Sequence, residues 1–172
     1  MIDTMPSSTP VDRAPRPQSA APPLDAIERR LLEVLAVDGR LSVAGLAERI
    51  GISRAATYTR LDNLRESGVI EGYSVRVNPA RVGLGITALV LIAGRQPAWR
   101  SLRRRLAAMP EVEYCAFTTG EYDALLVVRV PDVETLRDVV LERLQASEEI
   151  RATQTIFVLE EVVKRPLVLP QA

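Results

Sequence analysis

The sequence predicts an α+β protein with an N-terminal helix-turn-helix domain of the winged-helix kind and a C-terminal ferredoxin-like βαββαβ domain. Two observations predict this fold. Residues 41–72 have the pattern of two short helices separated by a tight turn, and after residue 85 strands alternate with helices. The expected organisation is a tail over residues 1–23, the helix-turn-helix domain with an extended arm over 24–78, a linker over 79–85 and the second domain over 86–172.

The residue types that are missing exclude several kinds of chemistry. Histidine is absent from the 172 residues, and cysteine occurs once, at Cys115. Ser-His and Cys-His pairs, His-based metal sites and an internal disulfide are therefore impossible. Cys115 lies in an alternating apolar stretch, where a small buried side chain is expected. We expect a protein that is not an enzyme and has no catalytic residue, metal or cofactor.

The N-terminal segment differs in composition from the rest of the chain. Residues 1–23 are rich in Pro, Ser and Ala and contain almost no large apolar side chain. Such a segment buries too little surface to offset the entropy of ordering, so we expect a disordered tail. The N-terminus lacks the layout of a signal peptide, and no apolar run approaches the roughly 18 residues of a membrane span. We expect a cytoplasmic protein without a membrane partner.

Three helices are predicted in the N-terminal domain. The first covers residues 24–39, with apolar side chains at helical spacing. The second covers residues 43–49 and has Ser42 as its N-cap. Gly51 fits a C-cap that needs a positive φ, and Ser53 can cap the next helix. One helix therefore ends and another begins within three residues.

The third helix is predicted to have a buried side and a free side. Its buried side holds Thr57, Leu61 and Leu64, and on or near the other side lie Ala55, Tyr58, Thr59 and Asp62. In a helix-turn-helix domain the second helix of the motif enters the DNA major groove. The candidate DNA-binding residues are Ser53, Arg54, Ala55, Tyr58, Thr59 and Arg60.

These candidates have side chains suited to duplex DNA. Ala55 allows close approach, Tyr58 and Thr59 can contact base edges, and Arg54 and Arg60 are expected beside phosphates. Residues 40–65 contain five Arg against two acidic residues, which suits contact with the DNA backbone without a strongly basic surface. The alternative is an ordinary helical hairpin whose polar face is merely solvated.

After an extended arm over residues 69–77, closed by Asn78-Pro79, the elements follow the order β-α-β-β-α-β. They are a strand over 86–93, a helix over 97–109, strands over 112–119 and 122–130, a helix over 131–146 and a strand over 150–163. The residues expected to face the sheet are Trp99, Leu102 and Leu106 in the first helix and Val133, Leu136, Val140 and Leu144 in the second. Two helices on one face of an antiparallel sheet leave its other face uncovered, so we expect dimerisation through that face.

Most of the sequence resembles a known family. LDAIERRLLEVLAVDGRLSVAGLAERIGIS followed by RAATYTRLDNLRESGVIEGYSVRVNP is similar to the N-terminal half of the Lrp/AsnC family, the feast/famine transcriptional regulators. The GEYD at residues 120–123, VRVPD at 128–132 and LEEVVKR at 159–165 are similar to the amino-acid-sensing domain of these proteins. The resemblance covers residue 24 to about residue 167. It implies a regulator that binds double-stranded DNA, responds to an amino acid, and forms dimers that assemble to tetramers, octamers or larger rings.

The resemblance also implies an effector site. Its candidate residues are Gly120, Glu121, Tyr122, Asp123, Thr153 and Thr155. A free amino acid needs donors for its carboxylate and an acceptor for its ammonium group. Gly120 lets backbone amides approach the carboxylate, Glu121 or Asp123 can pair with the ammonium, and Tyr122 can pack on the effector side chain. The alternative is a hairpin turn whose acidic residues are only solvated.

We interpret the chain as a cytoplasmic, sequence-specific transcriptional regulator, dimeric or larger, whose DNA affinity depends on a small amino acid. One alternative is an enzyme with the same two-domain fold, similar to the sirohaem decarboxylases, and the absence of His argues against it. Another is an amino-acid-sensing subunit that does not bind DNA, and the intact helix over residues 53–64 argues against that. A cluster of four Arg between residues 100 and 105 can wrap DNA around an oligomer or form a solvated helix face, and we favour the second.

Overall fold

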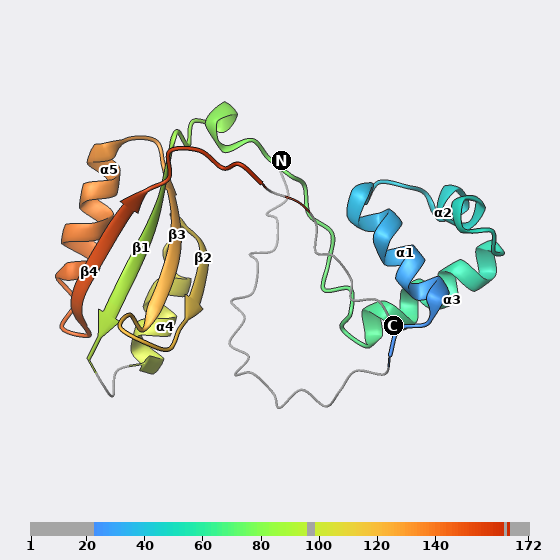
Figure 1. Ribbon diagram of the computed structural model, residues 1–172, viewed down its shortest axis with the longest axis horizontal. Helices are drawn as coiled ribbons and strands as arrows, with labels where there is room; N and C mark the ends of the chain where they lie inside the picture. Colours follow the sequence, from blue (N-terminus) through green and yellow to red (C-terminus); the bar gives the residue numbers. More distant parts are fainter. Residues whose placement is uncertain (1–22, 96–98, 164, 166–172) are drawn as a thin grey trace, which may run out of the picture. The chain divides into compact units, whose positions relative to one another are not determined.

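The computed structural model describes residues 23–95, 99–163 and 165, which form two compact units divided between residues 76 and 77 (Figure 1). The expected disordered tail lies outside the described residues except for its last residue. Among the described residues, no helix is both long enough and apolar enough to cross a membrane. Each unit is built around its own hydrophobic core.

The first unit contains the three predicted helices, α1 (Ala26–Val37), α2 (Val43–Ile50) and α3 (Arg54–Glu66). Asp25 caps α1 in a capping box: its carboxylate accepts from the Glu28 amide at 2.7 Å, and the Glu28 carboxylate accepts from the Asp25 amide at 3.0 Å. The core of the unit is Leu31, Leu46 and Leu61, one from each helix. The three helices therefore hold one another in place through a small apolar centre.

The second unit is a four-stranded antiparallel sheet with helices on one face. Its strands are β1 (Ile86–Gly94), β2 (Val112–Phe117), β3 (Ala124–Val130) and β4 (Ile150–Phe157), in the order β2-β3-β1-β4. The helices are α4 (Trp99–Ala107) and α5 (Val133–Asp138), and α5 continues as the π-helix η2 (Val139–Gln145). A short 3₁₀ helix, η1 (Pro79–Val82), precedes β1. The predicted ferredoxin-like order of elements is confirmed.

The core lies between the sheet and its helices. Fully buried side chains from the central strands meet apolar side chains from the helices, namely Ala88, Val90, Ile92, Leu126 and Val128 from the sheet and Leu102, Leu106, Leu136, Val139 and Leu144 from the helices. The predicted inward positions Leu102, Leu106, Leu136, Val140 and Leu144 are confirmed as buried. The side chain of Trp99 lies outside the described residues.

Two predicted features of this unit are wrong. Val133 is 57% exposed, because it occupies the first turn of α5 directly after the N-cap Asp132, and Val139 takes the core position instead. The wider turn of the π-helix shifts the buried positions away from regular helical spacing. The last strand ends at Phe157 rather than Val163. The segment expected to be a linker, residues 79–85, contains η1.

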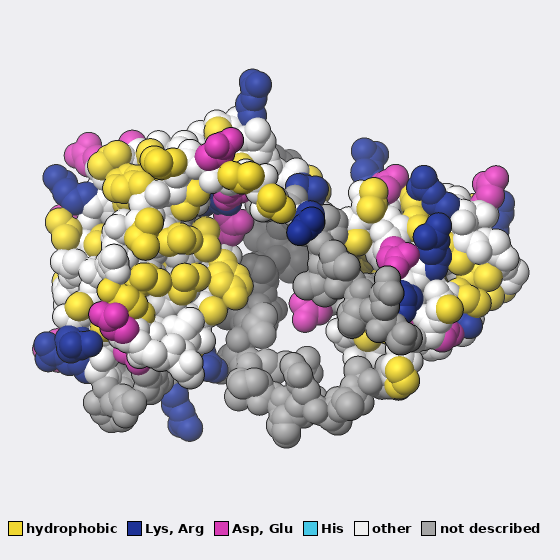
Figure 2. All heavy atoms as spheres, viewed as in Figure 1, with side chains coloured by type: hydrophobic (Ala, Val, Ile, Leu, Met, Phe, Trp, Pro, Cys, Tyr) yellow, Lys and Arg dark blue, Asp and Glu magenta, His cyan; other side chains and the backbone are white. Residues whose placement is uncertain are grey.

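Among the described residues, no helix covers the opposite face of the sheet, which is apolar in its centre (Figure 1). Leu89 and Leu91 of β1 lie next to Val127 and Leu125 of β3, and Tyr114 of β2 is 55% exposed on the same face. Figure 2 shows hydrophobic side chains gathered over these strands. An uncovered apolar sheet face is typical of a surface that a second protein covers.

A charged cluster borders this apolar face. The Arg129 side chain is only 9% exposed and donates to Glu113, to Glu161 at 2.5 Å and to the Thr87 hydroxyl at 2.7 Å. Burial by itself would lower the pKa of Arg129, but the hydrogen bonds to the two carboxylates outweigh burial and raise it. Because Glu161 follows β4, this cluster fixes the segment after the last strand against β3.

Candidate DNA-binding surface and effector site

The turn between α2 and α3 has the predicted geometry. Gly51 adopts a φ of 81°, in the left-handed region, and its amide donates to the Ala47 carbonyl at 2.9 Å. Ser53 caps α3 by accepting from the Ala56 amide at 3.1 Å, as Ser42 caps α2 by accepting from the Gly45 amide at 3.1 Å. These local bonds set the direction in which α3 leaves the turn.

Helix α3 has the expected buried and free sides. Thr57, Leu61 and Leu64 are buried, and the Thr57 hydroxyl is satisfied by donating to the Ser53 carbonyl at 3.0 Å. Exposed on the other sides of the helix are Arg54, Ala55, Tyr58, Thr59 and Asp62, with Tyr58 57% exposed. Thr59 donates its hydroxyl to the Ala55 carbonyl at 3.1 Å, which leaves its methyl group and hydroxyl lone pairs available. The structure thus brings most of the predicted DNA-binding residues onto one accessible surface.

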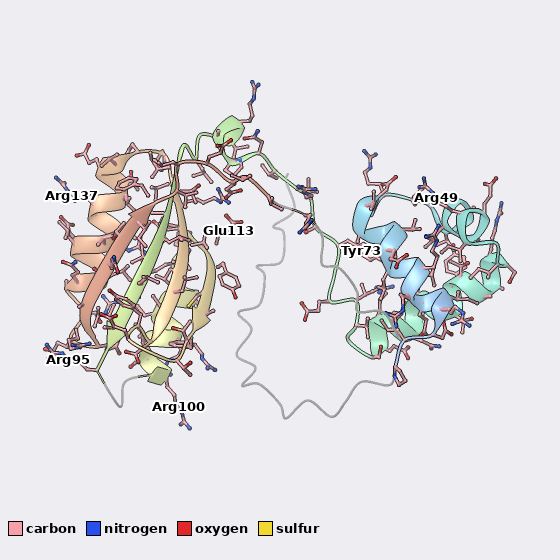
Figure 3. The ribbon with its side chains drawn as sticks, in the orientation of Figure 1. Arg49, Tyr73, Arg95, Arg100, Glu113 and Arg137 are labelled. Atoms are coloured by element: carbon pink, nitrogen blue, oxygen red, sulfur yellow. The ribbon has the colours of Figure 1, made fainter. Side chains whose placement is uncertain are left out.

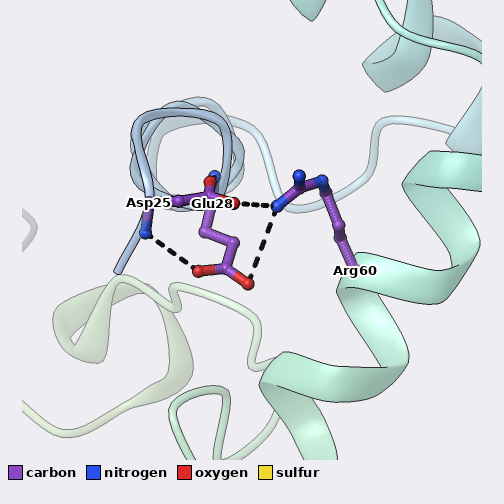
Figure 4. Close-up of polar contacts among 3 residues, drawn as sticks. All are labelled: Asp25, Glu28 and Arg60. Carbon is purple, nitrogen blue, oxygen red and sulfur yellow. Dashed lines mark hydrogen bonds and ion pairs between the residues drawn. The ribbon is translucent and has the colours of Figure 1, made fainter. Parts of the chain in front are cut away.

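Arg60 departs from the prediction. It was expected beside phosphates, but its guanidinium turns toward the start of α1, where it pairs with Asp25 and lies 3.7 Å from the Glu28 carboxylate (Figure 4). The pKa of Asp25 is lowered most by the hydrogen bond from the Glu28 backbone amide and next by the hydrogen bond from Arg60. Arg60 therefore connects α3 to the capping box of α1, a long-range pairing that helix periodicity alone cannot reveal.

Arg60→Gln is expected to lower the stability of the first unit by about 0.5–1 kcal/mol, since the ion pairs are partly exposed. The salt dependence of DNA binding should change little, whereas Arg54→Gln should reduce that dependence and leave stability nearly unchanged. Because the pKa of Asp25 is lowered in the folded protein, the Arg60–Asp25 pair contributes its full stabilisation when the pH is above 3.8, the ordinary pKa of the carboxyl group. That stabilisation is lost as the pH falls below 3.8 and the carboxylate becomes protonated. Thermal unfolding and DNA titrations at several salt concentrations measure both effects. A stable Arg60→Gln protein with a reduced salt dependence would place Arg60 on the DNA instead.

The loop over residues 118–123 joins β2 to β3 and is tied to the sheet at several points. The Asp123 carboxylate accepts from the Gly94 amide at 2.7 Å, and the Asp123 amide donates to the Ile92 carbonyl at 2.8 Å. The Thr118 hydroxyl donates to the Tyr122 carbonyl at 2.6 Å. Gly120 adopts a φ of 118°, a conformation that a side chain disfavours. The loop is thus a fixed structure at the sheet end and not only a solvated turn.

The predicted effector residues separate into two groups. The Tyr122 hydroxyl donates to the side-chain oxygen of Gln154 at 2.6 Å. Gln154 pairs in register with Leu91, on the uncovered face of the sheet, while Thr153 and Thr155 pair with Ile92 and Val90 on the helix-covered face.

The hydroxyl of Thr153 accepts a hydrogen bond from the side-chain amide of Gln145 at 2.7 Å, so Thr153 contacts η2. Gln154 is not among the residues predicted from the sequence, although strand alternation predicts that its side chain lies on the opposite face of the sheet from those of Thr153 and Thr155, which flank it.

Nothing in the described chain suggests a metal centre or a reactive thiol. Among the described residues, no group of three or more Cys, Asp or Glu side chains is placed to hold a metal ion. Cys115 is half-buried, and burial raises the pKa of its thiol despite the nearby positive charge of Arg103. A thiol held in its neutral form is a weak nucleophile.

The fold and the exposed helix define a class of protein: a helix-turn-helix DNA-binding protein with a separate α+β unit. Comparison with known proteins agrees. Residues 24–71 match the family model for a winged helix-turn-helix DNA-binding domain, and residues 87–168 match that for the Lrp/AsnC ligand binding domain. The chain belongs to the Lrp/AsnC family and is a DNA-binding transcriptional regulator.

Relatives of known name share most of the chain. The transcriptional regulator LrpA of Mycobacterium tuberculosis is 38% identical over 135 residues, which cover 78% of this chain and 89% of the relative. AldR of Mycolicibacterium smegmatis is 35% identical and covers 81% of this chain and 83% of its own length. A transcriptional regulator from Neisseria meningitidis, solved as a complex with L-methionine, superposes with a TM-score of 0.81 at 31% identity, covering 86% of this chain and 97% of its own.

Proposed function

We propose that this regulator binds a small free amino acid at the loop over residues 118–123 and that the bound amino acid changes its affinity for DNA. The observation that carries the proposal is the anchored loop itself. Gly120 has a positive φ, and apart from Gly120 itself and its two chain neighbours no described atom lies within 4 Å of the position where a side chain would begin. Glu121 and Asp123 supply negative charge for an ammonium group. The L-methionine complex of the Neisseria relative supports this ligand class.

Within the proposal, the exposed surface of α3 reads the operator. Ser53, Arg54 and Ala55 lie at the first turn of α3, and Tyr58 and Thr59 follow one turn later. Side chains near the start of a recognition helix are the ones that reach base edges, and arginine at the helix start suits a phosphate. Tyr58 and Thr59 are therefore assigned to base contacts and Arg54 to the backbone.

The proposal also includes a homodimer as the smallest active form. The uncovered apolar face of the sheet is one surface available for pairing. A second is the arm over residues 71–77, where Tyr73, Val75 and Val77 are exposed at alternate positions of a segment that belongs to neither helix nor strand. Alternating apolar residues suit pairing with a second extended segment. Dimers that assemble further are part of the same proposal.

A ligand screen tests the amino-acid part directly. Each of the twenty encoded amino acids is added to the full chain, and thermal unfolding is followed. A ligand that binds only the folded protein at about 100 times its dissociation constant adds roughly 2.7 kcal/mol, a shift that is easily measured. Amino acids that raise the melting temperature are then tested for an effect on DNA affinity. A screen without any shift would leave the regulator without this class of effector.

Removing the N-terminal segment is expected to leave both oligomerisation and DNA binding intact. A chain that begins at Leu24 keeps the capping box and every described helix of the first unit. It should show the same oligomeric state and the same DNA affinity as the full chain, because residues 1–23 are poor in large apolar side chains. Light scattering and DNA binding curves on both proteins make the comparison. A monomeric shortened chain would assign the tail a role in assembly.

A further inference from the structure

Helix α4 carries a concentration of positive charge in a chain that is neutral as a whole. The 172 residues contain 22 basic and 22 acidic side chains. Within α4, by contrast, there is no acidic residue, and its arginines are Arg100, Arg103, Arg104 and Arg105. All four are exposed. Positive charge is therefore gathered on one helix of the second unit.

The core contacts of α4 determine which way its arginines point. Leu102 and Leu106 are each 1% exposed and belong to the core of the second unit. At about 3.6 residues per turn, Arg100 and Arg104 lie on the opposite side of the helix from these leucines, one turn apart, and the other two arginines lie on its flanks. Figure 3 shows Arg100 extending away from the unit. The outward face of α4 is therefore formed by the pair Arg100 and Arg104.

The two flanking arginines are held by neighbouring elements. The Arg103 guanidinium lies over the Phe117 ring, 5.4 Å from its centroid. Arg105 donates to the Ser147 hydroxyl at 3.1 Å. A guanidinium that stacks on a ring keeps its N–H edge available to an anion, and a side chain that is already held loses less freedom when a ligand binds. Both flanks of the outward pair are thus partly arranged before any ligand arrives.

The outward pair has no compensating negative charge nearby. Within residues 23–95, 99–163 and 165, no carboxylate lies within 4.0 Å of the guanidinium nitrogens of Arg100 or Arg104. Like charges three or four positions apart destabilise a helix, and a cation in the first turn, such as Arg100, faces the positive end of the helix dipole. A solvated helix face, which the sequence favours, does not require such an arrangement. It is expected of a surface whose counter-charges come from a ligand.

We propose that the outward face of α4 is a second DNA contact surface, at which Arg100 and Arg104 bind phosphates that α3 does not contact. Duplex DNA carries one negative charge per about 1.7 Å of its axis, and it is the polyanion that this regulator binds through its first unit. Contacts between arginine and phosphate add affinity for DNA of any sequence. The inference depends on DNA binding and not on the amino-acid response.

A small anion suits this face less well than an extended one. Small molecules bind in concave sites that enclose most of their surface. The pocket of about 250 Å³ beside Phe117 is lined by Arg103 but not by Arg100 or Arg104, which project from the outer side of the helix. Two cations on an open surface match a ligand whose negative charges repeat along its length.

The double variant Arg100→Gln/Arg104→Gln tests this surface in the full-length protein. Binding to a duplex of mixed sequence is titrated at several salt concentrations. Each phosphate contact adds about one to the steepness of log K against log salt, so the steepness should fall by roughly two. The dissociation constant at about 0.1 M salt should rise roughly tenfold to a hundredfold. Arg100→Lys/Arg104→Lys, which keeps both charges, should retain most of the steepness.

Arg137→Gln is the matched control, because Arg137 is an exposed arginine on α5 of the same unit and pairs with Asp138 at 3.0 Å. It should bind DNA with the salt dependence of the unaltered protein. Light scattering and circular dichroism verify that each variant keeps its oligomeric state and its fold.

Two results would overturn the proposal. If Arg100→Gln/Arg104→Gln keeps the salt dependence of the unaltered protein, α4 does not contact DNA, and an acidic protein becomes the other candidate partner for this face. If Arg137→Gln loses as much steepness per arginine as the double variant, the effect reflects the net charge of the protein and not a contact at α4.

Discussion

Replacing Tyr58 by Ala is expected to remove most of the ability to distinguish the operator from unrelated DNA. Tyr58 is more than half exposed on the free side of α3 and one turn after the helix start, where base edges come within reach. A base contact contributes about 1–3 kcal/mol, so the affinity for the operator should fall by a factor of roughly 10 to 100, while binding to scrambled DNA changes little. Thr59→Ala should behave in the same way.

Arg54→Ala provides the contrast for this experiment. Arg54 lies at the first position of α3 and is assigned to a phosphate, so its loss should weaken binding to operator and scrambled DNA about equally. Titrations on both DNAs at one salt concentration give the ratio of affinities for each variant. An unchanged ratio in Tyr58→Ala and Thr59→Ala would mean that a different surface of the first unit reads the bases.

Gly120→Val is expected to abolish the response to the amino acid. The φ of 118° at Gly120 is one that a β-branched residue adopts only with strain, so the loop must change its shape. The surroundings are open, which means that the substitution acts through the backbone and not through a clash with the core. The ligand-induced rise in melting temperature should disappear, while dimerisation and DNA binding without ligand remain.

Gly83→Val separates this effect from general backbone strain. Gly83 also has a positive φ, of 86°, and open surroundings, but it follows η1 and lies outside the loop. It should lower stability to a similar degree and keep the ligand response. Equal ligand shifts in Gly120→Val and the unaltered protein would show that the loop over residues 118–123 is not part of the effector site.

Local signals predicted the parts of the fold that local chemistry determines. Ser42, Gly51 and Ser53 are capping residues whose preferences depend on bonds within three or four positions, and all three have the predicted role. The buried side of α3 and the order of strands and helices followed from hydrophobic spacing in the same way. Such features need no knowledge of distant segments.

The features that sequence patterns could not provide depend on distant contacts. Arg60 pairs with Asp25 across 35 positions, and Tyr122 pairs with Gln154 across 32. The pairing of Arg103 with the ring of Phe117 likewise joins a helix to a strand end. In each case the neighbouring residues in the sequence give no sign of the contact, because it forms only when two distant elements pack together. The sequence therefore points to the loop over residues 118–123 as a candidate effector site, but it cannot reveal a contact between distant segments such as that of Tyr122 with Gln154.

The arm over residues 71–77 reaches the boundary between the two units, and in the proposed dimer it would limit how the two helix-turn-helix units engage DNA. Residues 71–77 belong to neither helix nor strand, and a fully extended chain spans at most about 3.3–3.6 Å per residue, so the arm can reach roughly 25 Å. In the proposed dimer, once one helix-turn-helix unit has bound its half-site, the other is confined near the DNA at a high effective concentration. This increase in effective concentration is lost when the two half-sites lie too far apart for the arm to span. The length of the arm therefore sets the largest separation of half-sites at which binding of the first unit strengthens binding of the second.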